Sequence, residues 1–423
     1  IVEDFGRGMP VDWNNGEGRY NWELLFCEMY AGGKYGEGED NYEFSLGLNG
    51  LGLCATQYAS AWMTADIYRD GYHYHLDFKK GENVGGLQKE AYKGRRTGSI
   101  IHWKPDDEVF TDIDIPLDYY RDVMKRQAGV NAGVTFRLRS EVSAGRFDTQ
   151  DFLYENGIRD YIAELAGEDP ITEPVCWEAE RQGRDRADKP EYKVKLSCAC
   201  CFSNKVQRIE HYHNSSWLEH GGAPDKAVRS AFVSAIDAYL KQNNKYNKSE
   251  SKVTYQDIFD SLVLVTNCFS TQTSYENQTK KAITNKFVAQ AMTEFLKHQL
   301  EVYFIEHPDE AEKACKQVLI NKHIDKMDID AQIKKNLEKR DAKLRKQGID
   351  PAKLNNYANM STRNVKTSSA PAATKAKAPS MTQEQKEEAM RKATEYYNKN
   401  AAKPGSLASK ANMVRDYNEK NNK

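Results

Sequence analysis

The sequence predicts an α+β protein made of two folded segments followed by a polar tail. Residues 1–143 combine closely spaced glycines with short aromatic and β-branched runs, a texture typical of glycine loops between strands. From residue 144 to residue 325, alternating strand-like runs and apolar residues at helix spacing occur together. A further helix is expected over 326–350. Residues 351–423 are rich in Ser, Thr, Ala, Pro and Lys, so we expect a mostly disordered tail there.

Within the first segment, the residue pattern predicts several elements in chain order. Apolar residues Trp22, Leu25 and Met29 share one side of a predicted helix, and the region between residues 30 and 52 is too glycine-rich for anything but loop. The expected elements are the end of a strand at 2–4, a helix at 20–29, strands at 99–102 and 134–138, and a helix at 118–126.

The second segment repeats this mixture with longer helices. Apolar residues recur every three or four positions in two stretches, and an apolar run between them is a candidate buried strand. Pro308 followed by acidic residues is typical of a helix start. The expected elements are paired strands at 193–198 and 206–209, helices at 226–240 and 287–300, a buried strand at 262–267 and a helix from 308.

Bulk composition places the chain among polar proteins with more than one domain. Its 423 residues suffice for two or three cores, and mean hydropathy is −0.79. No run of 18 apolar residues occurs, so no transmembrane helix and no membrane partner are expected. The net charge of −1 conceals a basic tail, because residues 341–423 hold 17 Lys or Arg against 8 Asp or Glu.

Cysteines and histidines give little sign of a metal site. Eight cysteines without a secretory leader fit a reducing cytoplasm, where we expect the protein to reside. The cluster at 198–201 has no second ligand pair near it, which favours buried strand cysteines over zinc. His211, His213 and His220 are interpreted as surface or packing residues of a loop and helix start.

Three glycine-rich elements follow one another within about fifty residues, and together they carry the strongest indication of function. Each is weak alone, because none has the context of a dinucleotide-binding fingerprint or a Walker A loop. The elements are Asp4-Phe5-Gly6-Arg7-Gly8-Met9-Pro10, Ala31-Gly32-Gly33-Lys34 and Gly47-Leu48-Asn49-Gly50-Leu51-Gly52.

In this order the three elements resemble the nucleotide-binding motifs of GHKL ATPases, and the surrounding residues are similar to the B subunits of gyrase and topoisomerase IV. The resemblance runs from about residue 1 to about residue 340. It implies a GHKL (Bergerat-type) α/β sandwich over 1–143, without its N-terminal helix. It also implies a transducer domain, like domain 2 of ribosomal protein S5, over 144–325.

The resemblance also implies a role for each matched residue. Asp4 would accept a hydrogen bond from the adenine amino group, with Gly6 and Gly8 allowing close backbone approach and Met9 and Pro10 forming an apolar wall. Ser99, in a Thr-Gly-Ser segment like the family's TGT, would support that carboxylate through water. The phosphates would be held by backbone N–H groups at a helix start and by a lysine. The residues matched to this phosphate role are Gly32, Gly33, Lys34, Gly47, Leu48, Asn49, Gly50, Leu51 and Gly52.

Three further segments resemble the same family in the second half of the chain. Residues 154–158 (YENGI) are similar to its YEGGI, and Asn214 to Gly222 to the segment that opens the transducer helix. The most specific match is 275–280 (YENQTK), which resembles FEGQTK. By this match Gln278 and Lys280 are the candidate catalytic residues, because they would contact the γ-phosphate.

Membership of this family implies ATP and Mg²⁺ as cofactors, and DNA, a topoisomerase A subunit and a second copy of the chain as partners. The family's general-base glutamate and Mg²⁺-binding asparagine lie on a helix before the first strand. This sequence starts after that helix and ends without a TOPRIM motif, so the metal ligand stays unknown and weak hydrolysis is expected.

Two alternatives remain open from the sequence. One is a non-catalytic remnant that binds nucleotide, or binds DNA through the basic tail in a salt-dependent way. The other is a different GHKL protein, such as a chaperone, a mismatch-repair protein or a histidine kinase, although YENGI and YENQTK argue against each. Gyrase and topoisomerase IV are not distinguished.

Overall fold

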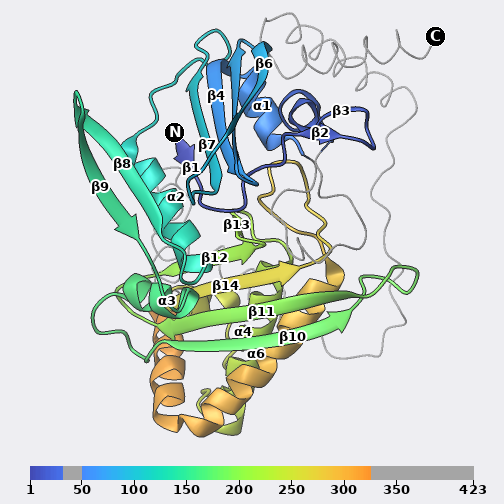
Figure 1. Ribbon diagram of the computed structural model, residues 1–423. Coiled ribbons are helices and arrows are strands. Elements are labelled where there is room, and N and C mark those ends of the chain that lie inside the picture. The colour runs from blue at the N-terminus through green and yellow to red at the C-terminus, as the bar shows by residue number, and fades with distance from the viewer. Residues whose placement is uncertain (32–49, 325–423) are drawn as a thin grey trace, which may run out of the picture. The chain divides into compact units, whose positions relative to one another are not determined.

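The computed structural model describes residues 1–31 and 50–324 and contains two five-stranded sheets (Figure 1). The expected helix at 326–350 and the expected tail at 351–423 lie outside the described residues. The mixed α+β composition matches the sequence prediction. Among the described helices, none is both long and apolar enough to cross a bilayer.

The first sheet is antiparallel and has the strand order β1-β7-β4-β5-β6. Its strands alternate, with one face buried and the other partly exposed, as a sheet packed on one side requires. The bounds are β1 Val2–Glu3, β4 Ser60–Arg69, β5 Tyr72–Lys79, β6 Glu82–Ala91 and β7 Gly98–Pro105. The predicted strands at 2–4 and 99–102 are thereby confirmed.

The buried face of this sheet packs against a π-helix, η1 (Glu23–Cys27), and a short helix, α1 (Gly52–Tyr58). Phe26 of η1 is fully buried and stacks on Phe78, with ring centroids 5.1 Å apart. The expected helix at 20–29 is therefore shorter, and Met29 is 61% exposed instead of sharing the apolar side. The wider π-helical turn shifts which residues face the sheet and brings Phe26 inward.

Two smaller hairpins and one helix complete the first half of the chain. Strands β2 (Trp13–Asn14) and β3 (Arg19–Tyr20) pair with each other, as do β8 (Phe136–Ser143) and β9 (Arg146–Phe152). Helix α2 (Leu117–Val130) packs on β8 and confirms the helix predicted at 118–126.

The second sheet has the order β10-β11-β14-β12-β13, and all its neighbours are antiparallel except β12 and β14. The predicted strands at 193–198 and 206–209 exist as β11 and β12, but they are not paired because β14 lies between them. The bounds are β10 Val175–Gly183, β11 Tyr192–Phe202, β12 Arg208–His213, β13 Ser216–Trp217 and β14 Leu262–Ser270.

Helices cover both faces of the second sheet. On one face lie α4 (Ala223–Gln242), α6 (Lys286–Glu306) and the helix at 308–324, with α5 (Tyr255–Phe259) beside them. On the other face, α3 (Ile158–Ala166) and the last turn of α2 pack together with residues of β11, β12 and β14.

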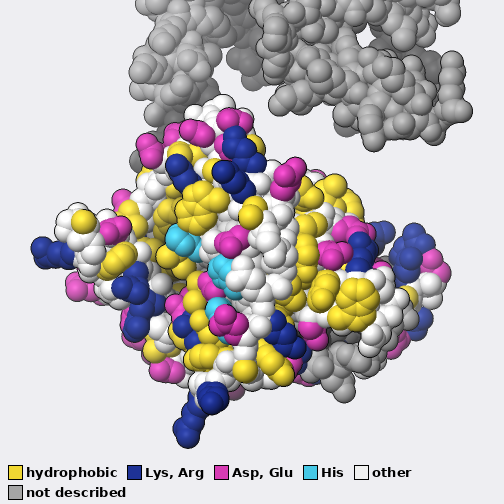
Figure 2. Space-filling view, turned by 45° about the horizontal axis from the view of Figure 1, so that its top comes forward, with side chains coloured by type: hydrophobic (Ala, Val, Ile, Leu, Met, Phe, Trp, Pro, Cys, Tyr) yellow, Lys and Arg dark blue, Asp and Glu magenta, His cyan; other side chains and the backbone are white. Residues whose placement is uncertain are grey.

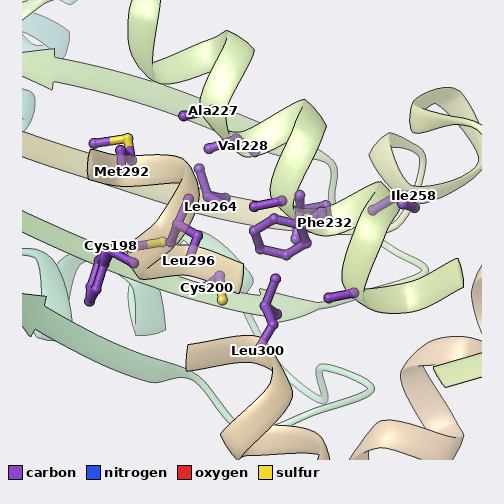
Figure 3. Packing of buried hydrophobic residues seen from close by; sticks show 14 of the residues in the cluster. Cys198, Cys200, Ala227, Val228, Phe232, Ile258, Leu264, Met292, Leu296 and Leu300 are labelled. Atoms are coloured by element: carbon purple, nitrogen blue, oxygen red, sulfur yellow. The ribbon is translucent and has the colours of Figure 1, made fainter. Parts of the chain in front are cut away.

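The main core lies between the second sheet and its helices α4 and α6 (Figure 3). Phe232 points from α4 into this layer near Leu264 of β14, while Leu296 and Leu300 approach from α6. Cys198 and Cys200 line the same core, and all four cysteines of β11 and β14 are buried and free. The interpretation of 198–201 as buried strand cysteines is thus confirmed.

Replacing Phe232 by alanine is expected to destabilise the protein by about 3–5 kcal/mol, because a fully buried ring leaves a cavity between helix and sheet. The measurement is urea unfolding monitored by circular dichroism. Phe147→Ala is the control, since Phe147 is 46% exposed on β9. Equal losses for the two variants would contradict the described packing.

Candidate nucleotide site

The loop after β1 is attached to β7 at Ser99, which is nearly fully buried. The Asp4 amide donates to the Ser99 carbonyl at 2.9 Å, and the Met9 amide donates to Ser99 Oγ at 3.2 Å. Ser99 was predicted to act on the Asp4 carboxylate through water. Its hydroxyl accepts directly from the Met9 amide and its carbonyl from the Asp4 amide, so Ser99 holds both ends of that loop, and the water link to the Asp4 carboxylate stays a prediction.

The carboxylate of Asp4 is exposed at the start of this loop. Its Oδ1 accepts a hydrogen bond from the Gly6 amide at 2.8 Å, which fixes the side chain against the loop backbone. A carboxylate held in this way offers its outer lone pairs to a donor from solvent. An exocyclic amino group of a purine is such a donor.

The glycines near Asp4 have a steric reason to be glycine. Gly8 has a φ of +77°, and a Cβ there would lie 2.7 Å from the Tyr68 carbonyl oxygen. Gly98 has a φ of +122°, and its Cβ would lie 2.0 Å from the Asp4 carbonyl oxygen. Gly98 and Arg69, whose Nη1 donates to the Gly8 carbonyl at 2.9 Å, position this loop. The sequence alone did not single them out.

Most of the predicted phosphate loop is not covered by the structure. Six candidate residues lie outside the described residues: Gly32, Gly33, Lys34, Gly47, Leu48 and Asn49. Gly50 has a φ of +58°, and Leu51 precedes the first turn of α1, where its carbonyl accepts from the Ala55 amide at 2.8 Å. A Cβ on Gly52 would meet none of the described residues within 4 Å, so those residues leave the start of α1 open.

The motif at 275–280 forms the tip of a hairpin between β14 and α6. The Glu276 amide donates to the Ala282 carbonyl at 2.9 Å, and the Thr284 amide donates to the Ser274 carbonyl at 2.8 Å. Lys280 has a φ of +59°, and its Nζ lies 5.8 Å from the centroid of the Tyr275 ring. Gln278 is exposed at the same tip.

This hairpin is bonded directly to the start of α4. Gly222 bridges to Ile283, and the Ala223 amide donates to the Ile283 carbonyl at 2.9 Å. A second backbone bond of 2.9 Å joins the His220 amide to the Lys281 carbonyl. A Cβ on Gly222 would lie 2.3 Å from the Ile283 carbonyl oxygen, so the close contact requires glycine there.

The structure therefore groups the candidate residues in two sets. Asp4, Gly6, Gly8, Met9 and Ser99 belong to one hydrogen-bonded loop of the first sheet, with Pro10 exposed beside it. Gln278 and Lys280 lie on the hairpin of the second sheet.

Of the three histidines interpreted as surface or packing residues, His220 is exposed, whereas His211 and His213 are buried and lie on strand β12 instead of in a loop. His211 Nδ1 lies 2.8 Å from Thr266 Oγ1, and His213 Nδ1 lies 3.0 Å from Cys268 Sγ. Burial lowers the pKa of His213 to about 4, so this ring is neutral at pH 7.

Comparison with solved structures shows which fold these elements form. The 43K ATPase domain of Thermus thermophilus gyrase B, solved with an aminocoumarin, matches 78% of this chain and 82% of its own, with a TM-score of 0.54 and 21% identity. The topoisomerase IV ATP-binding domain of Francisella tularensis matches 76% of this chain and 83% of its own, with a TM-score of 0.56 and 22% identity. The fold is thus that of a GHKL ATPase domain, as predicted.

Sequence comparison gives a more specific similarity. The DNA gyrase B family model matches residues 157–334. The DNA gyrase B protein of Streptococcus pyogenes is 27% identical, and the match covers 75% of this chain and 48% of that protein. The DNA gyrase B protein of Synechocystis is 26% identical, and the match covers 70% of this chain and 27% of that protein. The chain is related to the B subunits of bacterial type IIA DNA topoisomerases. It spans about a quarter to a half of the length of these curated relatives.

Gly222→Ala is expected to detach the 275–280 hairpin from α4, because the added methyl group would collide with the Ile283 carbonyl. Gly86→Ala is a matched control, since Gly86 also has a positive φ (+71°) but open space around its Cβ position. Both variants carry the backbone strain of about 1–3 kcal/mol, whereas only Gly222→Ala adds the collision. Hydrogen exchange at the Ala223 amide should accelerate in Gly222→Ala alone. Equal exchange in the two variants would refute the anchoring role.

Proposed function

We propose that this chain is the ATP-operated gate and transducer segment of the B subunit of a type IIA DNA topoisomerase. In this role it would couple ATP binding and hydrolysis to the passage of DNA strands. The observation that carries the proposal is the pair of sets just described: an exposed carboxylate on a fixed glycine loop, and a hairpin bonded to the start of a long helix. The relatives' identity as gyrase B proteins supports it.

The residues of the first sheet suit a purine base. The exposed Asp4 carboxylate would accept from the adenine amino group, while Ser99 keeps the loop in position through the Met9 amide. Met9 and Pro10 would face the ring. The open helix start at Gly50–Gly52 suits phosphate oxygens, with Gly32, Gly33, Lys34 and the other loop residues as further candidates.

The hairpin of the second sheet suits a sensor of the terminal phosphate. Lys280 would offset negative charge on that phosphate, with Gln278 beside it. Because backbone bonds join this hairpin to residues 220–223, any displacement of Lys280 would be passed to the start of α4. A transducer role would operate through these backbone hydrogen bonds.

The proposed domains are those expected from the sequence. Residues 1–143 would form the ATP-binding domain and 144–325 the transducer, followed by a helix at 326–350 and a tail at 351–423. The division at 143 falls in the turn between β8 and β9, so a division after Phe152 keeps that hairpin intact. The complete enzyme would act in the cytoplasm on DNA, with Mg²⁺, an A subunit and a second copy of the chain.

Asp4→Asn is expected to weaken binding of ATP analogue and ADP alike by about 10-fold to 100-fold, because the adenine contact loses a charged acceptor. Calorimetric titration with a non-hydrolysable ATP analogue measures this. Asp107→Asn, at an exposed position just after β7, is the control and should leave affinity unchanged. Unaltered affinity in Asp4→Asn would exclude the adenine assignment.

Lys280→Met is expected to act differently, because Lys280 would contact the γ-phosphate, which ATP carries and ADP lacks. Affinity for the ATP analogue should fall about 10-fold or more while affinity for ADP stays the same. Lys281→Met is the matched control. Lys281 lies on the same hairpin as Lys280, and its ammonium is paired with Glu219. If Lys280→Met leaves the ratio of the two affinities unaltered, Lys280 is not a γ-phosphate sensor.

A further inference from the structure

The partly exposed face of the first sheet carries a cluster of metal-binding side chains that the nucleotide site does not use. Asp66 lies on β4, and His73 and His75 lie on β5. One ligand atom from each residue lies within 4.8 Å of the other two. Histidine side chains reach the surface beside acidic ones in Figure 2.

Strand geometry brings these three residues together. His73 and His75 are two positions apart on one strand, so their side chains leave the same face. In the register of β4 and β5, Asp66 is opposite His75 and diagonal to His73. The alternate residues of both strands, such as Ile67 and Leu76, form the core on the other face.

The distances suit a bound ion. Asp66 Oδ1 lies 2.8 Å from His73 Nε2 and 2.8 Å from His75 Nδ1. Ligands of a tetrahedral zinc ion are about 3.3 Å apart, given metal–ligand bonds of about 2.0–2.1 Å. Widening each of these two distances by about half an ångström would bring it to that spacing.

Neighbouring side chains hold the two rings in the required orientation. His75 Nε2 lies 3.2 Å from Asp77 Oδ2, so with an ion on Nδ1 the ring would keep its proton on Nε2 and donate it to Asp77. A carboxylate behind a metal-binding histidine fixes its tautomer in this way. His73 stacks on Tyr68, with centroids 4.7 Å apart and ring planes 11° from parallel.

We propose that Asp66, His73 and His75 form a binding site for a divalent transition-metal ion, and that zinc is the ion their chemistry suits. Two imidazoles and one carboxylate favour such an ion over the hard cations Mg²⁺ and Ca²⁺, which take oxygen ligands. The three side chains are 27–28% exposed, which gives an ion access from solvent. Three protein ligands leave a coordination position for water or for a ligand from a partner.

The site would link β4 to β5 and requires no nucleotide. Its test is calorimetric titration of zinc chloride into the full chain without a histidine tag. The chain is first stripped of metal, kept in a non-chelating reductant and freed of nucleotide. One equivalent of zinc should bind, and cobalt in its place should give visible d–d absorption. Zinc should also raise the unfolding temperature by selective binding to the folded state.

Variants assign this binding to the cluster. His73→Asn and His75→Asn should each weaken zinc binding by roughly 100-fold or more, and Asp77→Asn by about 10-fold to 100-fold, as expected for an outer carboxylate. His298→Asn is the control, because His298 is exposed on α6. Circular dichroism checks that each variant is folded.

Two results would overturn the proposal. One is zinc binding by the His73→Asn, His75→Asn double variant that is as tight as in the parent chain. The other is a parent chain that takes up no more zinc than this double variant, which would leave a hydrogen-bonded surface cluster without a metal role. Neither result bears on nucleotide affinity, which is measured without zinc.

Discussion

Burial of β14 on both of its faces is the constraint that organises the second sheet. Leu262 and Leu264 face α4 and α6, whereas Val263 and Val265 face α3 and the end of α2. A strand covered on both sides is apolar wherever a polar side chain would lose its hydration without gaining a hydrogen-bond partner. This requirement explains the run from 262 to 265. It also forces β11 and β12 to be the flanking strands that complete its backbone hydrogen bonds.

Where β14 does carry polar residues, they connect it to neighbouring elements. Asn267 Nδ2 donates to the Val130 carbonyl at 3.1 Å and so attaches the end of α2 to the sheet. Asn214, after β12, accepts from the Ser270 amide at 2.9 Å at the point where β14 ends. The hairpin at 275–280 therefore leaves from a fixed position. Its return strand is fixed too, because buried Asn285 accepts from the Ser274 amide at 2.8 Å. The tip that carries Lys280 lies between these two fixed ends.

The periodicity of apolar residues predicted the helices and strands that are buried on one face or on both faces. It did not predict strand order, which depends on partners distant in the sequence. Helices α4 and α6 and strand β14 were predicted because their apolar residues recur at the spacing of the element itself. The order of β11 and β12 was not, since it depends on β14, which comes later in the chain. The second half of β12 was predicted as a loop, because the partners of His211 Nδ1 and His213 Nε2 lie on β14 and its following turn, far along the sequence.

The same distinction applies to the candidate sites. The glycine motif at 4–10 was recognisable because two further glycine elements follow it in the order of the family that it resembles. The steric role of Gly98 was not, because the atom it must accommodate belongs to Asp4 at the other end of the segment. His73 and His75 are visible as an alternating pair in the sequence. Their convergence on Asp66 becomes evident only with the strand register.

That register is determined by the turn and by the core rather than by the cluster itself. A two-residue turn joins β4 to β5, and both of its residues, Asp70 and Gly71, have positive φ values of 51° and 78°. Asp-Gly at these two positions favours the tight hairpin whose twist matches that of its strands. A slip by one residue would expose the whole apolar face of β5 and bury its histidines. The free energy of the core therefore holds Asp66 opposite His75, so the polar groups on the outer face are preorganised.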